Sequence, residues 1–325
     1  MREIGRDTQF ADRSRVIAVI GVLLLLVGVA AAALGPMELY CFYLFAEGGR
    51  FHYEGFGFGS FMFAVIAIQV TGYYVIAMIC ISLGWGHLRL RRWARRLSLS
   101  FLGFWFIVGV PLVIVFMAML VISKKPSLGT VAAVLPSLVL LYPVIPGLLR
   151  RFYRSRDVRM TFETRDSAPH WSERIPLSIL VLCTLYGFYI IALHMAILFR
   201  GAFPLAGVLI TDMAGVALAD ASILWLACLI WGTLREQSWA WWGALLYFSV
   251  MTVSVFWTFS RLSLADILQV MRFAPLETRA LSGIPMQGMH LAAFLGLPLL
   301  ATLGLIIYSR RSFGTSGPRA DGVRN

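Results

Sequence analysis

Charged side chains are scarce in this chain of 325 residues. Lys, Arg, Asp and Glu make up 14% of it, against roughly 25% in a typical soluble domain. Hydrophobic residues make up 59% and lie in runs of about 20, the length at which a helix crosses the hydrocarbon core. In lipid the backbone must satisfy its polar groups internally, so these runs have to be helices. The composition therefore excludes an ordinary soluble domain and predicts an all-α integral membrane protein.

Cysteine is also scarce, and the usual signatures of metal and catalytic sites are missing. The four cysteines have no metal-ligand spacing, and we interpret them as small apolar residues. The sequence contains no H-E-x-x-H, G-x-S-x-G, Walker A or C-x-x-C pattern. We therefore expect no metal site and no cofactor, and we favour a non-enzyme. Haem held by His194 and His290 is the alternative to this expectation.

Eight apolar runs predict eight transmembrane helices. They cover residues 16–34, 61–85, 99–122, 130–148, 176–199, 206–232, 240–259 and 288–308. The first run also resembles a signal peptide, because Arg13 and Arg15 precede it. It is longer than the 7–15 apolar residues of such a segment, so we interpret it as a membrane span.

Basic residues orient the predicted bundle. With a cytoplasmic N-terminus, 21 of the 28 Lys and Arg residues fall in cytoplasmic segments, including seven arginines in 149–175. This positive-inside bias places both termini in the cytoplasm and is typical of the prokaryotic cytoplasmic membrane. It explains the net charge of +12 without a nucleic-acid partner. The partners we expect are the lipid bilayer, anionic headgroups on the cytoplasmic side and a further membrane protein.

A ten-residue pattern, W-G-x-L-R-x-x-x-W-A, occurs twice at an offset of 146 residues, from Trp85 and again from Trp231. It predicts two parallel four-helix repeats related about the membrane normal. The glycines let a helix end, and the cations and indoles suit the headgroup interface. The predicted interfacial anchors are Trp85, Arg89, Trp93, Trp231, Arg235 and Trp239.

This repeat divides the chain into four parts. We expect an N-terminal tail at 1–15, a first repeat at 16–160 with an outer loop at 35–60, a second repeat at 161–310 with an outer loop at 260–287, and a disordered C-terminal tail at 311–325.

The two outer loops differ from each other. Residues 36–47 predict a short surface helix, followed by a glycine- and aromatic-rich stretch in which Arg50, His52 and Glu54 alternate with aromatic residues. That stretch is interpreted as a packed interfacial loop or as a ligand-binding loop. In the second loop, Ser263 and Asp266 form a predicted capping box before an amphipathic helix.

Polar residues inside predicted spans are the best pointers to function, since each charge at a helix centre costs about 2.5–3.5 kcal/mol or more. Span six holds Asp212, about six residues from its outer end, and Asp220 near the midplane. His194, His290 and Gln69 lie at comparable depths. These five residues predict a polar cavity open to the outside.

Three function classes remain open at this point. A transporter or permease for a small solute or ion would use the polar cavity at the repeat interface. A non-catalytic subunit or scaffold would use the apolar outer loops to bind a partner. A membrane-embedded enzyme would need His194 as a general base within hydrogen-bond reach of Asp212.

Overall fold

The computed structural model describes residues 10–52, 57, 60–122, 128–283 and 287–313. Within these residues, eight helices are long and apolar enough to cross a membrane, which indicates an integral multi-pass protein. Seven are single elements, namely α1 (Ser14–Phe45), α2 (Phe61–Leu88), α3 (Arg92–Ile122), α8 (Leu177–Ile197), α9 (Asp212–Leu234), α10 (Ser238–Arg261) and α13 (Gly288–Tyr308). The remaining span is composite and joins α4 (Leu128–Val139), the π-helical segment η1 (Leu140–Val144) and α5 (Ile145–Arg154).

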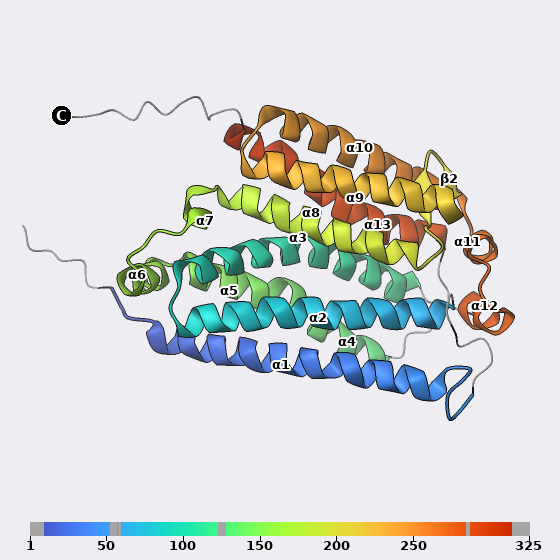
Figure 1. The fold of residues 1–325 in the computed structure, drawn as a ribbon, viewed down its shortest axis with the longest axis horizontal. Coiled ribbons are helices and arrows are strands. Elements are labelled where there is room, and N and C mark those ends of the chain that lie inside the picture. Colours follow the sequence, from blue (N-terminus) through green and yellow to red (C-terminus); the bar gives the residue numbers. More distant parts are fainter. Residues whose placement is uncertain (1–9, 53–56, 58–59, 123–127, 284–286, 314–325) are drawn as a thin grey trace, which may run out of the picture.

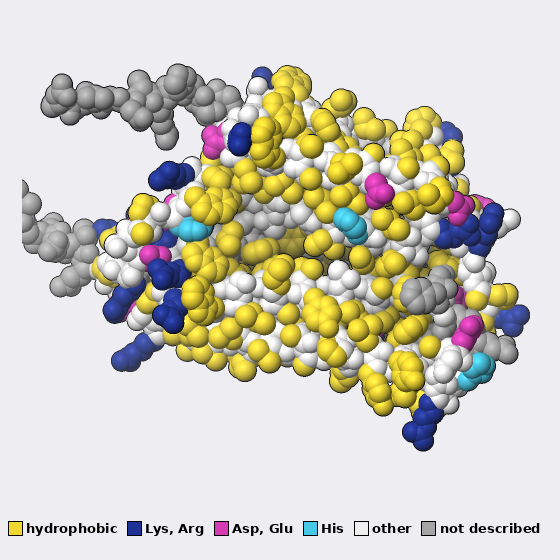
Figure 2. All heavy atoms as spheres, in the orientation of Figure 1, with side chains coloured by type: hydrophobic (Ala, Val, Ile, Leu, Met, Phe, Trp, Pro, Cys, Tyr) yellow, Lys and Arg dark blue, Asp and Glu magenta, His cyan; other side chains and the backbone are white. Residues whose placement is uncertain are grey.

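The eight spans run side by side and alternate in direction (Figure 1). We call one end of the bundle the basic end. It carries the turns at 89–91 and 235–237, α6 (Arg156–Arg165), α7 (Trp171–Arg174) and the 3-10 turn Ser309–Ser312. We call the other the hairpin end. It carries the strands β1 (Phe203–Leu205) and β2 (Val208–Ile210), and the helices α11 (Leu264–Met271) and α12 (Pro275–Ser282). Lys and Arg gather at these ends, and hydrophobic side chains cover the surface between them (Figure 2).

Glycines bring α1 unusually close to α2. Gly21, Gly28 and Gly35 recur every seven residues on the face of α1 that meets α2. A Cβ at Gly28 would lie 2.7 Å from Cγ1 of Ile81. Small residues at such spacing let two helices in a membrane approach through their backbones.

A buried histidine joins α2 to α5 at the basic end. His87 is fully buried, its Nδ1 lies 2.6 Å from the carbonyl oxygen of Leu83, and its Nε2 lies 2.7 Å from the hydroxyl of Tyr153. Both ring nitrogens therefore have partners, as a buried polar group requires. Around them Ile17, Leu99, Tyr153, Val158 and Phe162 form a compact apolar cluster.

The largest apolar core lies in the second half of the chain. Here α8 packs along α9, and α10 packs along α13. Tyr186 and Phe248 are fully buried, with their rings stacked at 5.4 Å. The first half meets this core mainly through α3, which contacts α8 and α13.

Two predicted boundaries are wrong. Residues 36–45 do not form a separate surface helix, because α1 continues through Pro36 to Phe45. Residues 206–211 do not belong to span six, because they form the turn and second strand of a β-hairpin. Ala206 and Gly207 take φ angles of 49° and 89° at its tip, which a helix cannot accommodate. The predicted helix after Ser263 is confirmed as α11, with its reciprocal capping box.

The two W-G-x-L-R-x-x-x-W-A turns share one backbone conformation. Leu90 and Glu236 occupy equivalent left-handed positions, with φ of 51° and 54°. The amide of Arg91 donates to the carbonyl of Gly86 at 2.8 Å, and the amide of Gln237 donates to that of Gly232 at 3.0 Å. Such bonds satisfy carbonyls at the end of a helix.

The predicted anchors pack together in both turns. The rings of Trp85 and Trp93 lie 6.5 Å apart, and those of Trp231 and Trp239 lie 6.3 Å apart. The guanidinium of Arg89 lies 5.9 Å from the ring of Trp85, and that of Arg235 lies 4.3 Å from the ring of Trp231. Each arginine therefore makes a cation–π contact with the tryptophan that opens its turn.

We predict that Gly232→Ala destabilises the protein by about 1–3 kcal/mol. The added Cβ would lie 2.5 Å from Cζ2 of Trp239 and 2.7 Å from Cβ of Ala240. Thermal unfolding in detergent measures the effect. Gly187→Ala is the control, because nothing lies within 4 Å of its added Cβ; equal melting temperatures for the two variants would contradict the prediction.

Candidate functional site

Asp212 lies at the hairpin end instead of inside a span. It is the first residue of α9 and pairs with Arg200, whose Nε donates to Oδ1 of Asp212 at 3.1 Å. The amide of Asp212 also donates to the carbonyl of Arg200 at 2.7 Å. This pair closes the base of the hairpin, so Asp212 lies at the start of α9 and not six residues inside the helix, as predicted.

Asp220, His194 and Gln69 are all exposed on the outside of the bundle. Asp220 lies eight residues into α9, about 12 Å along the helix axis. Nδ1 of His194 lies 2.8 Å from the carbonyl oxygen of Ile190, one turn earlier in α8. The pairing of His194 with Asp212 that the enzyme hypothesis requires is not formed between these described side chains.

His290 is buried and serves as a helix cap. Its Nδ1 accepts a hydrogen bond of 3.0 Å from the amide of Gln287 at the start of α13. The two histidines of the haem alternative thus differ in environment: His290 is buried in this cap, whereas His194 is exposed. Within the described part of the chain, no group of three or more His, Cys, Asp or Glu side chains could hold a metal ion.

The first outer loop is described only in part. Arg50 and His52 are exposed, and Nδ1 of His52 contacts the carbonyl oxygen of Glu47. Glu54 lies outside the described residues. A ligand-binding role for the three side chains of this loop therefore stays a prediction.

An apolar groove with a volume of about 770 Å³ lies between α2 and α8. It follows the halves of these helices nearest the hairpin end. Ligand sites in proteins typically measure about 300–1,000 Å³. The described side chains lining it include no Lys, Arg, Asp or Glu. None of the five polar cavity candidates lines it either.

Small residues leave the space that the groove occupies. On α2 its wall contains Thr71 and Gly72, and on α8 it contains Ala192 and Ala196. Nothing lies within 4 Å of a Cβ built on Gly72. Larger side chains at these four positions would fill the gap between the helices.

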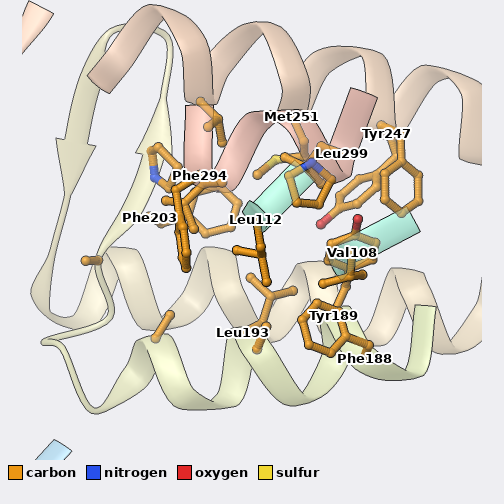
Figure 3. Close-up of a pocket in the computed structure, with 18 residues that line it drawn as sticks. Val108, Leu112, Phe188, Tyr189, Leu193, Phe203, Tyr247, Met251, Phe294 and Leu299 are labelled. Atoms are coloured by element: carbon orange, nitrogen blue, oxygen red, sulfur yellow. The ribbon is translucent and has the colours of Figure 1, made fainter. Parts of the chain in front are cut away.

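A smaller apolar pocket of about 270 Å³ continues from the groove into the second half of the chain. Phe188, Ala192 and Phe294 are among the residues that line both. Figure 3 shows side chains from α3, α8, α10, α13 and the hairpin converging on this pocket. The hydroxyl of Tyr189 in its wall is paired with Thr302 at 2.8 Å. The groove therefore extends from the outside of α2 and α8 toward the buried core.

The hairpin closes one side of this pocket and is held by α10. The hydroxyl of Ser254 donates to the carbonyl of Pro204 at 3.0 Å and accepts from the amide of Ala206 at 2.9 Å. The hydroxyl of Thr258 accepts from the amide of Gly207 at 3.1 Å. These bonds satisfy the turn, which has no helical partners of its own.

Helices α11 and α12 form a roof over the groove. The buried face of α11 lines the groove at the hairpin end through Ile267, Leu268 and Met271. Ser263 caps α11, and hydrogen bonds from its hydroxyl and its backbone amide hold the pKa of Asp266 below the usual value of an aspartate. The rings of Phe61, Phe199 and Phe273 lie 5.5–6.4 Å apart and close the groove beneath the roof.

Glu277 ties this roof to α2. Its two carboxylate oxygens accept from the amides of Phe61 and Met62, at 3.0 and 3.1 Å, and the hydroxyl of Ser60 accepts from the amide of Phe63 at 3.0 Å. Three of the amides that a helix leaves unpaired at its start are thus satisfied. A residue 216 positions away along the chain therefore caps α2.

Sequence reasoning did not find the groove, because no polar residue marks it. The signal that was available is the concentration of small residues on one face of each wall, Thr71 and Gly72 on one helix and Ala192 and Ala196 on the other. Only the folded arrangement shows that these two faces oppose each other.

Comparison with known proteins adds no function. No family model, no curated protein and no solved structure matches the chain.

We predict that Glu277→Ala speeds hydrogen exchange at the amides of Phe61 and Met62 by about fivefold. Loss of a side-chain cap costs about 1 kcal/mol of helix stability, which corresponds to that factor in a local opening equilibrium. Exchange followed by mass spectrometry of the full chain in detergent measures it. Thr278→Ala, on the same helix, is the control; unchanged exchange in Glu277→Ala would contradict the capping role.

Proposed function

We propose that the protein binds a lipid-like molecule, apolar or amphiphilic, which enters the groove sideways from the bilayer. The observation that carries this proposal is the apolar lining of a groove of about 770 Å³ between two candidate spans. Such a site lets a hydrocarbon chain exchange one apolar environment for another. A polar solute or ion would lose its hydration there without gaining hydrogen bonds.

The proposed function is still that of a transporter, but the expected substrate is an amphiphile and not a small solute or ion. The groove lies in the half of the bundle nearest the hairpin end, and its roof spans from α10 and α13 to α2. Movement of the roof relative to α2 would change access from that end. We therefore favour transport or transfer of an amphiphile over transport of a small solute or ion.

Two further features of the architecture belong to this proposal. The shared conformation of the two turns, at an offset of 146 residues, supports descent of the halves from one four-helix unit. The arginines at the basic end support a cytoplasmic position for that end, with both termini on that side. The groove would then lie in the outer leaflet.

We predict that Gly72→Phe reduces labelling of the groove by a photoreactive lipid several-fold. The new ring would project into space where nothing lies within 4 Å of the Cβ. The measurement is ultraviolet crosslinking of the purified full chain with a diazirine-labelled phospholipid, followed by peptide mapping of α2 and α8. A ring in the groove removes the volume that the acyl chain requires, and leaves labelling of the outer surface unchanged.

Gly304→Phe is the matched control for this experiment, because its Cβ also has nothing within 4 Å and it does not line the groove. Labelling confined to outward-facing residues in the wild type, or equal labelling of α2 and α8 in both variants, would overturn lipid binding in the groove.

A second candidate function, that of a subunit of a membrane complex, is favoured by Asp220. This acid is exposed, and no described side chain pairs with it. Its neighbours Ala217, Ala221 and Leu224 are exposed as well, so they present a shallow surface to a partner. A charge facing lipid at this depth costs about 2.5–3.5 kcal/mol, which a polar partner helix would offset.

We predict that Asp220→Leu shifts the protein to a smaller assembly in native electrophoresis of mildly solubilised membranes, whereas Asp220→Asn, which retains hydrogen bonding, does not. Ala33→Leu adds a similar bulk at an exposed position of α1, outside this surface, and serves as the control. If the wild type already migrates as a single chain, the subunit hypothesis fails.

A further inference from the structure

A second candidate site lies at the basic end, where α5 passes into α6. A surface pocket of about 650 Å³ is lined by Gly147, Arg150, Arg151, Arg154 and Ser155. Arg150 and Arg154 are one turn apart on α5 and so project on the same side of the helix. This pocket is separate from the apolar groove, which lies in the opposite half of the bundle.

The charges of this pocket are not compensated by carboxylates. The acidic side chains described between residues 12 and 173 at the basic end each pair with an arginine outside the pocket. These pairs are Asp12 with Arg165, Asp157 with Arg13, Glu163 with Arg159, Asp166 with Arg91, and Glu173 with Arg92. Arg150, Arg151 and Arg154 have no such ion pair among the described residues. The pocket therefore concentrates three positive charges that no described carboxylate pairs with.

Arg150 has an unsatisfied hydrogen-bond donor that a ligand could use. It is half-buried, its Nε is buried without a hydrogen-bond partner, and its guanidinium lies 6.0 Å from the ring of Phe106. A buried N–H without a partner costs about 1–3 kcal/mol, more when it is charged. An oxyanion in the pocket would satisfy it.

The backbone beneath these arginines is held in place. Tyr153, between them on α5, is bonded to His87 at 2.7 Å, and its carbonyl accepts from a guanidinium nitrogen of Arg95 at 3.3 Å. The hydroxyl of Ser155 ends α5 and caps α6 by accepting from the amide of Val158 at 3.4 Å. The arginines therefore project from a rigid corner, which lowers the entropic cost of binding.

We propose that this corner binds a phosphate group, through the guanidinium groups of Arg150 and Arg154, with Arg151 at the rim. Arginine suits phosphate because its planar fork donates two parallel hydrogen bonds. The source is the headgroup of an anionic phospholipid or a free phosphate, and the two differ in whether acyl chains are needed. Leu148, which directly follows Gly147 of the pocket lining on α5, is 64% exposed and offers an apolar surface for such chains.

The test uses the purified full chain in a neutral detergent and native mass spectrometry. Phosphatidylglycerol is offered against phosphatidylcholine, and inorganic phosphate is offered alone and as a competitor. We expect phosphatidylglycerol to be retained in preference to phosphatidylcholine, and the double variant Arg150→Gln with Arg154→Gln to lower that retention about tenfold, because two charge-assisted bonds are lost.

The double variant Arg310→Gln with Arg311→Gln is the matched control, since it removes two exposed arginines from the same end. Retention lowered equally in the control, or no preference for phosphatidylglycerol in the wild type, would overturn the site. Displacement by inorganic phosphate would identify free phosphate as sufficient, and resistance to it would identify the lipid. If the double variant does not fold, Arg151→Gln at the exposed rim is measured in its place, and a reduction of at least twofold is expected.

Discussion

Every backbone amide and carbonyl in the apolar interior needs a partner, and this constraint shapes the molecule. Within the helices the partners are internal. Where the chain leaves a helix at the hairpin end, side chains from distant segments supply them. Glu277 caps α2, and Ser254 and Thr258 hold the hairpin turn. These few polar side chains therefore decide where the non-helical segments lie, and the segments in turn enclose the groove.

The division between apolar and charged surface follows from the same constraint. The described ion pairs lie at the basic end, apart from that of Arg200 with Asp212 at the base of the hairpin. Between the ends, helices pack through small residues and aromatic rings, as in the glycine seam of α1 and the stacked rings of Tyr186 and Phe248. Asp220 is the described acid that departs from this division, which is why it favours a partner.

The helices were predictable because long apolar runs leave little choice of structure in lipid. The capping box of α11 was predictable because it rests on two residues three apart, Ser263 and Asp266. The hairpin was missed, since Val208, Leu209 and Ile210 continue the apolar pattern of the helix that follows. Its sequence signal was the Ala206-Gly207 pair between two short apolar stretches.

The candidate site was harder to predict than the fold. Polar residues in the predicted spans indicate a polar cavity, yet Asp212 closes the base of the hairpin and His290 caps α13. A groove defined by missing side-chain volume depends on which helix faces oppose each other. That information is absent from any single helix, because Gly72 and Ala192 come together only through tertiary packing.

The cap made by Glu277 also has a mechanical meaning. At the basic end α2 is held by the buried contact of His87 with Tyr153, whereas at the hairpin end it meets the roof through two hydrogen bonds to Glu277 and the ring contact of Phe61 with Phe273. Releasing these contacts costs on the order of a few kcal/mol, far less than separating a packed core. If the roof opens, α2 and the closely packed α1 would therefore move about the buried contact at the basic end.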